Sequence, residues 1–186
     1  MRALIVVLFS TLISVAPAFA ETTMGDDGLH KAEWMHDTFK DLREDLEEAT
    51  SQGKRFAIII EQRGCAYCKK MHETVFPEPE INFLLNEDYF FVQINMFGDV
   101  EIIDFDGEEL SERDAIQKWG VMFTPTILFF PEEVPQDVPA NRAAVAYIPG
   151  AFSKGMTLNM LNWVLEHGYE GEENFQAYHA RISYGG

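Results

Sequence analysis

Gly64-Cys65-Ala66-Tyr67-Cys68-Lys69-Lys70 contains both cysteines of the 186-residue chain. It directly follows the apolar, β-branched run of residues 56–60 and precedes a segment with helical character. A strand that ends in a short polar turn and then a helix places Cys65 at a helix N-terminus, where unpaired backbone N–H groups and the helix dipole stabilise an anion. We therefore expect the Cys65 thiol to ionise readily.

The second cysteine is expected on the same side of that helix. Cys68 lies about one helical turn after Cys65, close enough to attack a mixed disulfide formed there. A purely structural disulfide explains the pair less well, because a bridge across two intervening residues closes a very small loop and removes little entropy from the unfolded chain. The spacing predicts a dithiol–disulfide switch.

A soft-metal site is the alternative use of these residues. Cys65, Cys68 and His72 supply two thiols and an imidazole at helical spacing, which suits an ion such as copper if a fourth ligand comes from elsewhere. The chain has no second cysteine pair, and its other histidines precede the motif or lie far downstream. Covalent haem attachment requires a histidine directly after the second cysteine, where this chain has Lys69. We expect no metal and no cofactor.

Residues 1–20 have the composition of a secretory signal peptide. Arg2 gives a positive start, residues 3–15 are almost all apolar, and Ala18-Phe19-Ala20 has the small-x-small pattern of a cleavage site. No later stretch reaches the roughly 18–20 apolar residues that a membrane span needs. We expect cleavage after Ala20, export to the periplasm or another site outside the cytoplasm, no stable membrane insertion, and one domain over residues 21–186.

The charge balance excludes some partners. The chain carries 14 Lys and Arg against 31 Asp and Glu, a formal net charge of −17. Such a surface repels phosphate backbones and anionic lipid headgroups. We therefore expect neither nucleic acid nor a membrane surface as a partner, and solubility explains the acidity more simply than a specific basic partner does.

Apolar periodicity and turn signals divide the rest of the chain into helices and strands. Residues 96–110 form an acidic insertion with the turn signal Asp106-Gly107, which predicts a small hairpin. Strands are expected at 56–60, 89–95, 121–130 and 143–148, and helices at 29–49, from the cysteine pair to 76, and at 111–120, 153–167 and 172–182. This order predicts an α/β domain with a mixed central sheet.

A strand that ends in Cys-x-x-Cys on a helix, followed by Phe123-Thr124-Pro125-Thr126 at the start of a later strand, resembles the thioredoxin family. The resemblance covers residues 56–168. It implies an α/β, thioredoxin-like three-layer fold, to which this chain adds an N-terminal helix and the acidic insertion. It also implies a cis Thr124–Pro125 bond facing the cysteines, with the Thr124 backbone available to pair with an extended substrate chain.

The export signal, the acidic insertion and residues 61–71 look most similar to periplasmic thioredoxin-related proteins of the SoxW and SoxS type, which are linked to sulfur oxidation. This resemblance implies a reductant that keeps the cysteine or disulfide of a periplasmic partner protein in its working state. It also implies a membrane electron donor that recharges the cysteine pair.

The chain departs from typical thioredoxins at three places. Gly64 stands where they have Trp before the first cysteine, Ala66-Tyr67 replaces Gly-Pro between the cysteines, and Ile59 stands where they have a buried acid. Strand alternation puts Glu61 on the same face as Ile59, so Glu61 is either the proton acceptor for Cys68 or a solvated residue at the strand end. Tyr67 either shapes the substrate surface or packs in the ordinary way.

These patterns predict an enzyme, a thiol–disulfide oxidoreductase. The Cys65 thiolate attacks a substrate disulfide, and Cys68 then attacks the Cys65 sulfur and releases the reduced product. Two rivals remain open: a non-catalytic binding or regulatory module on the same fold, and the copper carrier.

Overall fold

The computed structural model describes residues 22–133 and 137–185, so the expected signal peptide at residues 1–20 lies outside the described part. The strands are β1 (Thr23–Met24), β2 (His30–Lys31), β3 (Met35–His36), β4 (Arg55–Glu61), β5 (Tyr89–Asn95), β6 (Glu101–Ile103), β7 (Glu109–Ser111), β8 (Thr126–Phe129) and β9 (Ala146–Pro149). The helices are α1 (Leu42–Ser51), α2 (Ala66–Thr74), α3 (Pro79–Glu87), α4 (Glu112–Trp119), α5 (Ala140–Ala143), α6 (Lys154–Leu165) and α7 (Phe175–Tyr184), with a 3-10 turn, η1 (Gly168–Glu170).

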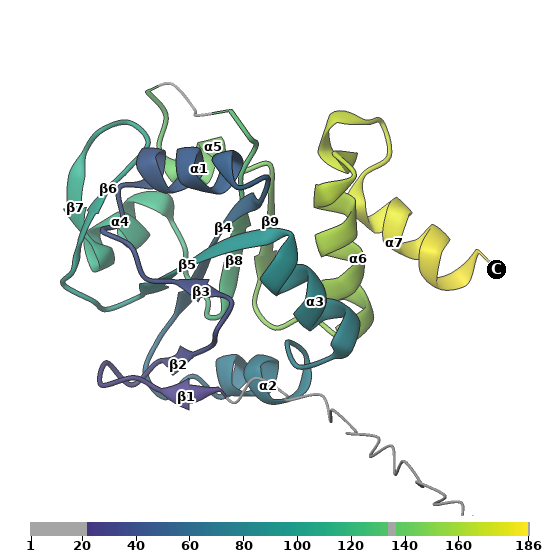
Figure 1. Cartoon of the computed structure of the whole chain (residues 1–186), viewed down its shortest axis with the longest axis horizontal. Helices are drawn as coiled ribbons and strands as arrows, with labels where there is room; N and C mark the ends of the chain where they lie inside the picture. The colour runs from purple at the N-terminus through teal and green to yellow at the C-terminus, as the bar shows by residue number, and fades with distance from the viewer. Residues whose placement is uncertain (1–21, 134–136, 186) are drawn as a thin grey trace, which may run out of the picture.

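Five strands form one mixed sheet in the order β3-β5-β4-β8-β9. β4 pairs in parallel with β5 and antiparallel with β8, and β9 pairs antiparallel with β8. Helices α1 and α4 pack on one face of this sheet, and α3 and α6 pack on the other (Figure 1). The predicted three-layer α/β architecture with a mixed central sheet is confirmed.

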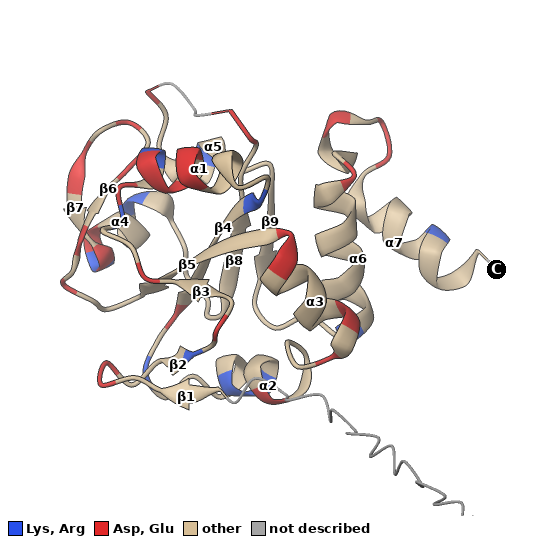
Figure 2. Ribbon diagram, in the orientation of Figure 1, with Lys and Arg blue, Asp and Glu red and all other residues tan. Residues whose placement is uncertain are grey.

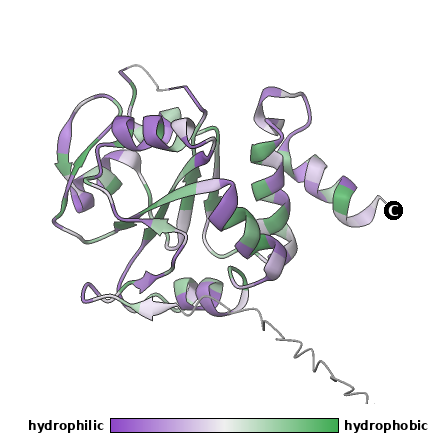
Figure 3. Cartoon of the chain, viewed as in Figure 1, coloured by the Kyte–Doolittle hydropathy of each residue, from purple (hydrophilic) through white to green (hydrophobic). Residues whose placement is uncertain are grey.

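Side-chain alternation along the central strands builds a core on each face. In β4, Ala57 and Ile59 belong to the core on the α3–α6 side, whereas Phe56, Ile58 and Ile60 belong to the core on the α1–α4 side. Because both faces are covered, the strand is an unbroken apolar run rather than an alternating one. Figure 3 shows this apolar character along the central strands and the helix faces that meet them.

The helix predicted at residues 29–49 begins later than expected. Helix α1 starts at Leu42, with Asp41 as its N-cap, and the residues before it form the short strands β2 and β3. Trp34 packs into the core on the α3–α6 side, whereas Leu42 packs on the α1–α4 side. One straight helix could not bury both side chains, because they lie on opposite faces of the sheet.

Two predicted strands are also displaced. The strand expected at 121–130 begins only at Thr126, directly after Pro125, which has no N–H to donate to a sheet. The strand expected at 143–148 is β9, shifted toward the C-terminus because α5 ends at Ala143. The strands predicted at 56–60 and 89–95 and the hairpin predicted in the insertion are confirmed by β4, β5 and β6–β7.

One buried carboxylate helps to hold the acidic insertion to the domain. Asp104 is fully buried and accepts hydrogen bonds from the Trp119 indole N–H (2.9 Å) and the Ala140 backbone N–H (2.9 Å). Lys118 lies 2.9 Å from the same carboxylate. Figure 2 shows Asp and Glu residues on α1, around β6–β7 and after α6. None of the described helices is long and apolar enough to cross a membrane.

Candidate active site

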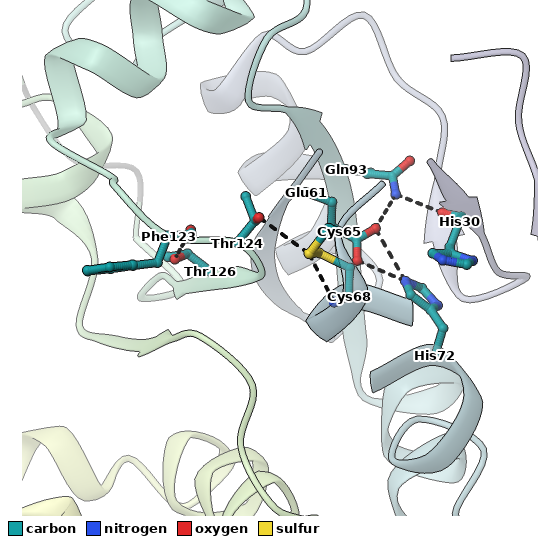
Figure 4. Close-up of a disulfide and its surroundings, with 9 residues drawn as sticks. All are labelled: His30, Glu61, Cys65, Cys68, His72, Gln93, Phe123, Thr124 and Thr126. Atoms are coloured by element: carbon teal, nitrogen blue, oxygen red, sulfur yellow. Dashed lines mark hydrogen bonds and ion pairs between the residues drawn. A yellow bond between two sulfur atoms is a disulfide. The ribbon is translucent and has the colours of Figure 1, made fainter. Parts of the chain in front are cut away.

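The turn after β4 places Cys65 at the N-cap of α2, as the sequence predicts. Gly64 has φ +74°, a left-handed conformation that glycine adopts without steric cost, and it turns the chain from the strand into the helix. The Cys65 sulfur accepts a hydrogen bond of 3.0 Å from the Cys68 backbone N–H (Figure 4). A backbone donor at a helix N-terminus stabilises negative charge on this sulfur.

The two cysteines form a disulfide, with their Cα atoms 5.2 Å apart. Their accessibilities differ: Cys65 is 9% exposed, whereas Cys68 is 1% exposed. A substrate can approach Cys65 from solvent, whereas Cys68 is reached only from inside the protein. This difference fits the predicted division of labour between an attacking and a resolving cysteine.

The loop before β8 brings a second motif against the first. The Thr124–Pro125 peptide bond is cis. The Thr124 hydroxyl donates to the Cys65 sulfur over 3.3 Å, although 59 residues separate the two in sequence (Figure 4). Pro125 is buried, and its carbonyl accepts a hydrogen bond of 2.7 Å from the Gly150 backbone N–H. The structure thus brings the predicted residues Thr124, Pro125 and Cys65 together.

Apolar side chains on the surface lie close to these two motifs in sequence. Tyr67, between the cysteines, is 65% exposed, so it is not packed in the core. Met122 and Phe123, directly before Thr124, are also exposed and line an apolar cavity of about 640 Å³ against β8 and β9. Exposed apolar side chains therefore accompany both motifs.

Glu61 is not a solvated residue at the strand end. It is 1% exposed, and its carboxylate oxygens lie 3.0 and 3.2 Å from the His72 Nε2 atom. The Gln93 side-chain amide also donates to this carboxylate, over 2.7 Å (Figure 4). The role of Glu61 in accepting the Cys68 proton remains a prediction.

The partners of Glu61 are not evident from the sequence. His72 has the spacing of a metal ligand to the cysteines, and Gln93 lies within an apolar run. Two signals could have found them: His72 lies four residues after Cys68 on α2, and Gln93 is the one amide in the otherwise apolar centre of β5. Next to this group, burial and the neighbouring His72 lower the pKa of His30.

The alternative of a metal site gains no support from the geometry. Within residues 22–133 and 137–185, no group of three or more His, Cys, Asp or Glu side chains is arranged to hold a metal ion. His72 directs Nε2 at Glu61, and both cysteine sulfurs are joined to each other.

Comparisons with known proteins agree with this architecture. No curated protein matches the sequence. A thioredoxin-fold protein from Helicobacter pylori is 16% identical, with a TM-score of 0.51 over 80% of this chain and 98% of that one. A thioredoxin from Thermus thermophilus is 18% identical, with a TM-score of 0.53 over 69% of this chain and 86% of that one. Such likenesses show the fold alone. The model of the thioredoxin-like domain family matches residues 42–136, more than half of the sequence, and the chain therefore belongs to that family.

Proposed function

We propose that this protein is a thiol–disulfide oxidoreductase that reduces disulfides of a partner protein. The observation that carries the proposal is the Cys65–Cys68 disulfide at the N-terminus of α2, with the more accessible sulfur facing the Thr124 hydroxyl. The Cys68 backbone N–H and the Thr124 hydroxyl both point at the Cys65 sulfur and would stabilise a thiolate there. The thiolate is the reactive form of cysteine.

In the reduced enzyme, the Cys65 thiolate attacks one sulfur of the substrate disulfide. A bond forms between Cys65 and that sulfur, the substrate disulfide breaks, and the first substrate thiolate leaves. Cys68 then loses its proton and attacks the Cys65 sulfur, which releases the second substrate thiolate. The enzyme ends with the Cys65–Cys68 disulfide, and the two electrons of its dithiol now reside on the two substrate thiols.

For the setting, we propose export to the periplasm and a role like that of SoxW and SoxS proteins, with a partner in sulfur oxidation and a membrane electron donor. The signal-like residues 1–20, the acidic insertion and the sequence around the cysteines support this proposal. The oxidised pair must be reduced again before each new cycle, which requires a donor of two electrons.

Two measurements test the proposal. The reduced mature protein should reduce insulin disulfides, and Cys65→Ser should abolish this activity. Equal inactivity of both proteins would instead favour a docking module without catalysis. Titration of the cysteine pair against thiol buffers then gives its redox potential and so the direction of electron flow. A redox potential of roughly −270 mV supports a reductant, and one of roughly −120 mV marks an oxidant.

A further inference from the structure

Most Lys and Arg side chains of the described residues are paired with acidic side chains. Lys40, for example, pairs with the buried Glu112, and Lys118 lies against three carboxylates. Within residues 22–133 and 137–185, the cations that lie in no ion pair are Lys54, Arg63, Lys70 and Arg142. Arg63 and Lys70 flank the cysteine pair in sequence, so two positive charges without an acidic partner accompany the attacking cysteine.

The turn between β1 and β2 holds Arg63 in place. The Arg63 guanidinium donates to the Asp27 carbonyl over 3.2 Å and to the Asp26 carbonyl over 3.4 Å. Gly28, with φ +76°, comes so close to the Arg63 side chain that an added Cβ atom would lie 2.5 Å from its Nε. Both acceptors are neutral carbonyls rather than carboxylates, and a guanidinium has five N–H donors. The side chain is exposed, so its remaining donors can reach a carboxylate of a partner.

A cavity leads from the attacking cysteine toward this guanidinium. Arg63 precedes Cys65 by two residues, so their Cα atoms lie at most about 7 Å apart. The cavity holds about 500 Å³ between the β1–β2 hairpin and α2, and its lining includes Gly28, Cys65 and Lys69. Glu73 also lines it and pairs with Lys69 over 3.6 Å. Because Gly28 borders both the cavity and the Arg63 side chain, a substrate side chain that enters here from Cys65 comes next to the guanidinium.

Lys70 adds the second positive charge. It lies on the exposed side of α2, one helical turn after the exposed Tyr67. On the other side of Cys65, the loop of residues 121–125 carries no charged side chain. The surroundings of the attacking cysteine therefore differ in charge from the rest of the chain, whose net charge is −17. Figure 2 shows this contrast between the Lys and Arg residues on α2 and the Asp and Glu residues on α1.

We propose that Arg63 and Lys70 recognise acidic residues next to the reacting cysteine of a partner protein. A guanidinium binds a carboxylate through two parallel N–H bonds, which gives the contact a fixed orientation. The contacts with the β1–β2 turn hold Arg63 before binding, so less side-chain entropy is lost when the partner binds. This inference rests on the proposed oxidoreductase function and specifies its substrate class, which is disulfides flanked by Asp or Glu.

Peptide disulfides with different flanking residues test this substrate preference. Three peptides share one sequence but carry Glu, Gln or Lys on both sides of a cysteine that is joined to mercaptoethanol. Their reduction by the reduced mature protein is followed by chromatography, and each rate is divided by the rate with dithiothreitol to correct for the reactivity of the peptide itself. We expect the Glu peptide to react about fivefold faster than the Gln peptide, the upper end of what an exposed ion pair contributes. The net charge alone predicts the reverse order, because it repels acidic peptides.

Variants then assign the preference to its residues. Arg63→Gln and Lys70→Gln should each lower the preference for the Glu peptide, and Arg63→Glu should reverse it. Arg142→Gln is the matched control, because Arg142 is also exposed and lies in no ion pair among the described residues. It belongs to α5, which lies at the opposite end of the molecule from α2 (Figure 1). This control changes the net charge by the same amount and should leave the preference unchanged.

The possible results separate the two proposals. If the wild type reduces none of the peptides, the proposed function and this inference fail together. If it reduces the Gln or the Lys peptide as fast as the Glu peptide, the oxidoreductase function stands and only the recognition of acidic residues is overturned. The same conclusion follows if Arg142→Gln lowers the preference as much as Arg63→Gln does, because net charge rather than position would then decide. Sodium chloride at roughly 0.5 M should remove most of the wild-type preference by screening.

Discussion

The Thr124 hydroxyl lies 3.3 Å from the Cys65 sulfur and donates a hydrogen bond to it. In the reduced protein the same hydroxyl would face the Cys65 thiolate, and a donor stabilises a charged acceptor more than a neutral one. Thr124→Val should therefore raise the pKa of the Cys65 thiol and slow its attack at neutral pH by roughly tenfold, the effect of losing one hydrogen bond to a charged group. Ultraviolet absorbance of the thiolate against pH measures the shift. Thr124→Ser keeps the donor and should restore the wild-type curve.

Phe123 should matter for protein substrates and not for small ones. It is 60% exposed and directly precedes Thr124. Phe123→Asp should lower the rate of insulin reduction by roughly tenfold, as expected when an apolar contact at the centre of an interface is lost, and leave the reaction with the small uncharged disulfide hydroxyethyl disulfide unchanged. Phe39→Asp alters an aromatic residue that is 97% exposed before α1 and should affect neither substrate. An equal loss with both substrates would show that Phe123 does not contact the protein substrate.

Asp104 should be among the most important polar side chains for stability. Asp104→Ala leaves the buried N–H groups of Trp119 and Ala140 without their acceptor. We expect a loss of about 3–5 kcal/mol in the free energy of unfolding, the usual effect of breaking a buried charged network. Urea unfolding measures it. Asp99→Ala removes an exposed partner of Arg113 and should leave the midpoint unchanged.

Asp45 should make stability depend on pH. Burial raises its pKa from 3.8 to about 7, although the Thr38 hydroxyl donates to it over 3.1 Å. Between these two pH values the folded protein holds a proton that the unfolded chain has lost, so this residue lowers stability as the pH rises toward 7. The loss has an upper limit of roughly 4 kcal/mol.

Asp45→Asn keeps the side-chain shape and cannot ionise. It should therefore flatten the fall in stability between pH 4 and pH 7 and stabilise the protein at pH 7. Thermal unfolding of both proteins across this range measures the difference. Parallel curves for wild type and variant would contradict the raised pKa.

The sequence was sufficient to predict the strands that carry the site. Residues 56–60 of β4 and 89–92 of β5 are covered on both faces, so each of these runs is apolar throughout and predicts a buried strand. The helix predicted at 29–49 begins only at Leu42, because Trp34 and Leu42 have helical spacing by coincidence and enter cores on opposite faces of the sheet. Only the tertiary structure shows that the two side chains do not share one helix face.

The candidate site also has residues that the sequence reveals and residues that it does not. The two cysteines and the Thr124–Pro125 pair are short motifs, so the sequence reveals them. The Glu61–His72–Gln93 group is not a motif: its members come from β4, α2 and β5, and His72 and Gln93 lie 11 and 32 residues after Glu61. The contact between Glu61 and Gln93 depends on the parallel register of β4 and β5, which no local pattern encodes.

The two-residue strand β3 has a consequence for self-association. β3 lies on the outer side of β5, where it pairs Met35 with Phe91 and His36 with Val92. The family match begins at Leu42, so a chain cut back to the matched residues would lose β3. The backbone N–H and C=O groups of β5 that β3 covers would then be open at a sheet edge, which is the usual template for intermolecular strand addition. The residues before α1 thus cover an edge of β5 that the family boundary would leave open.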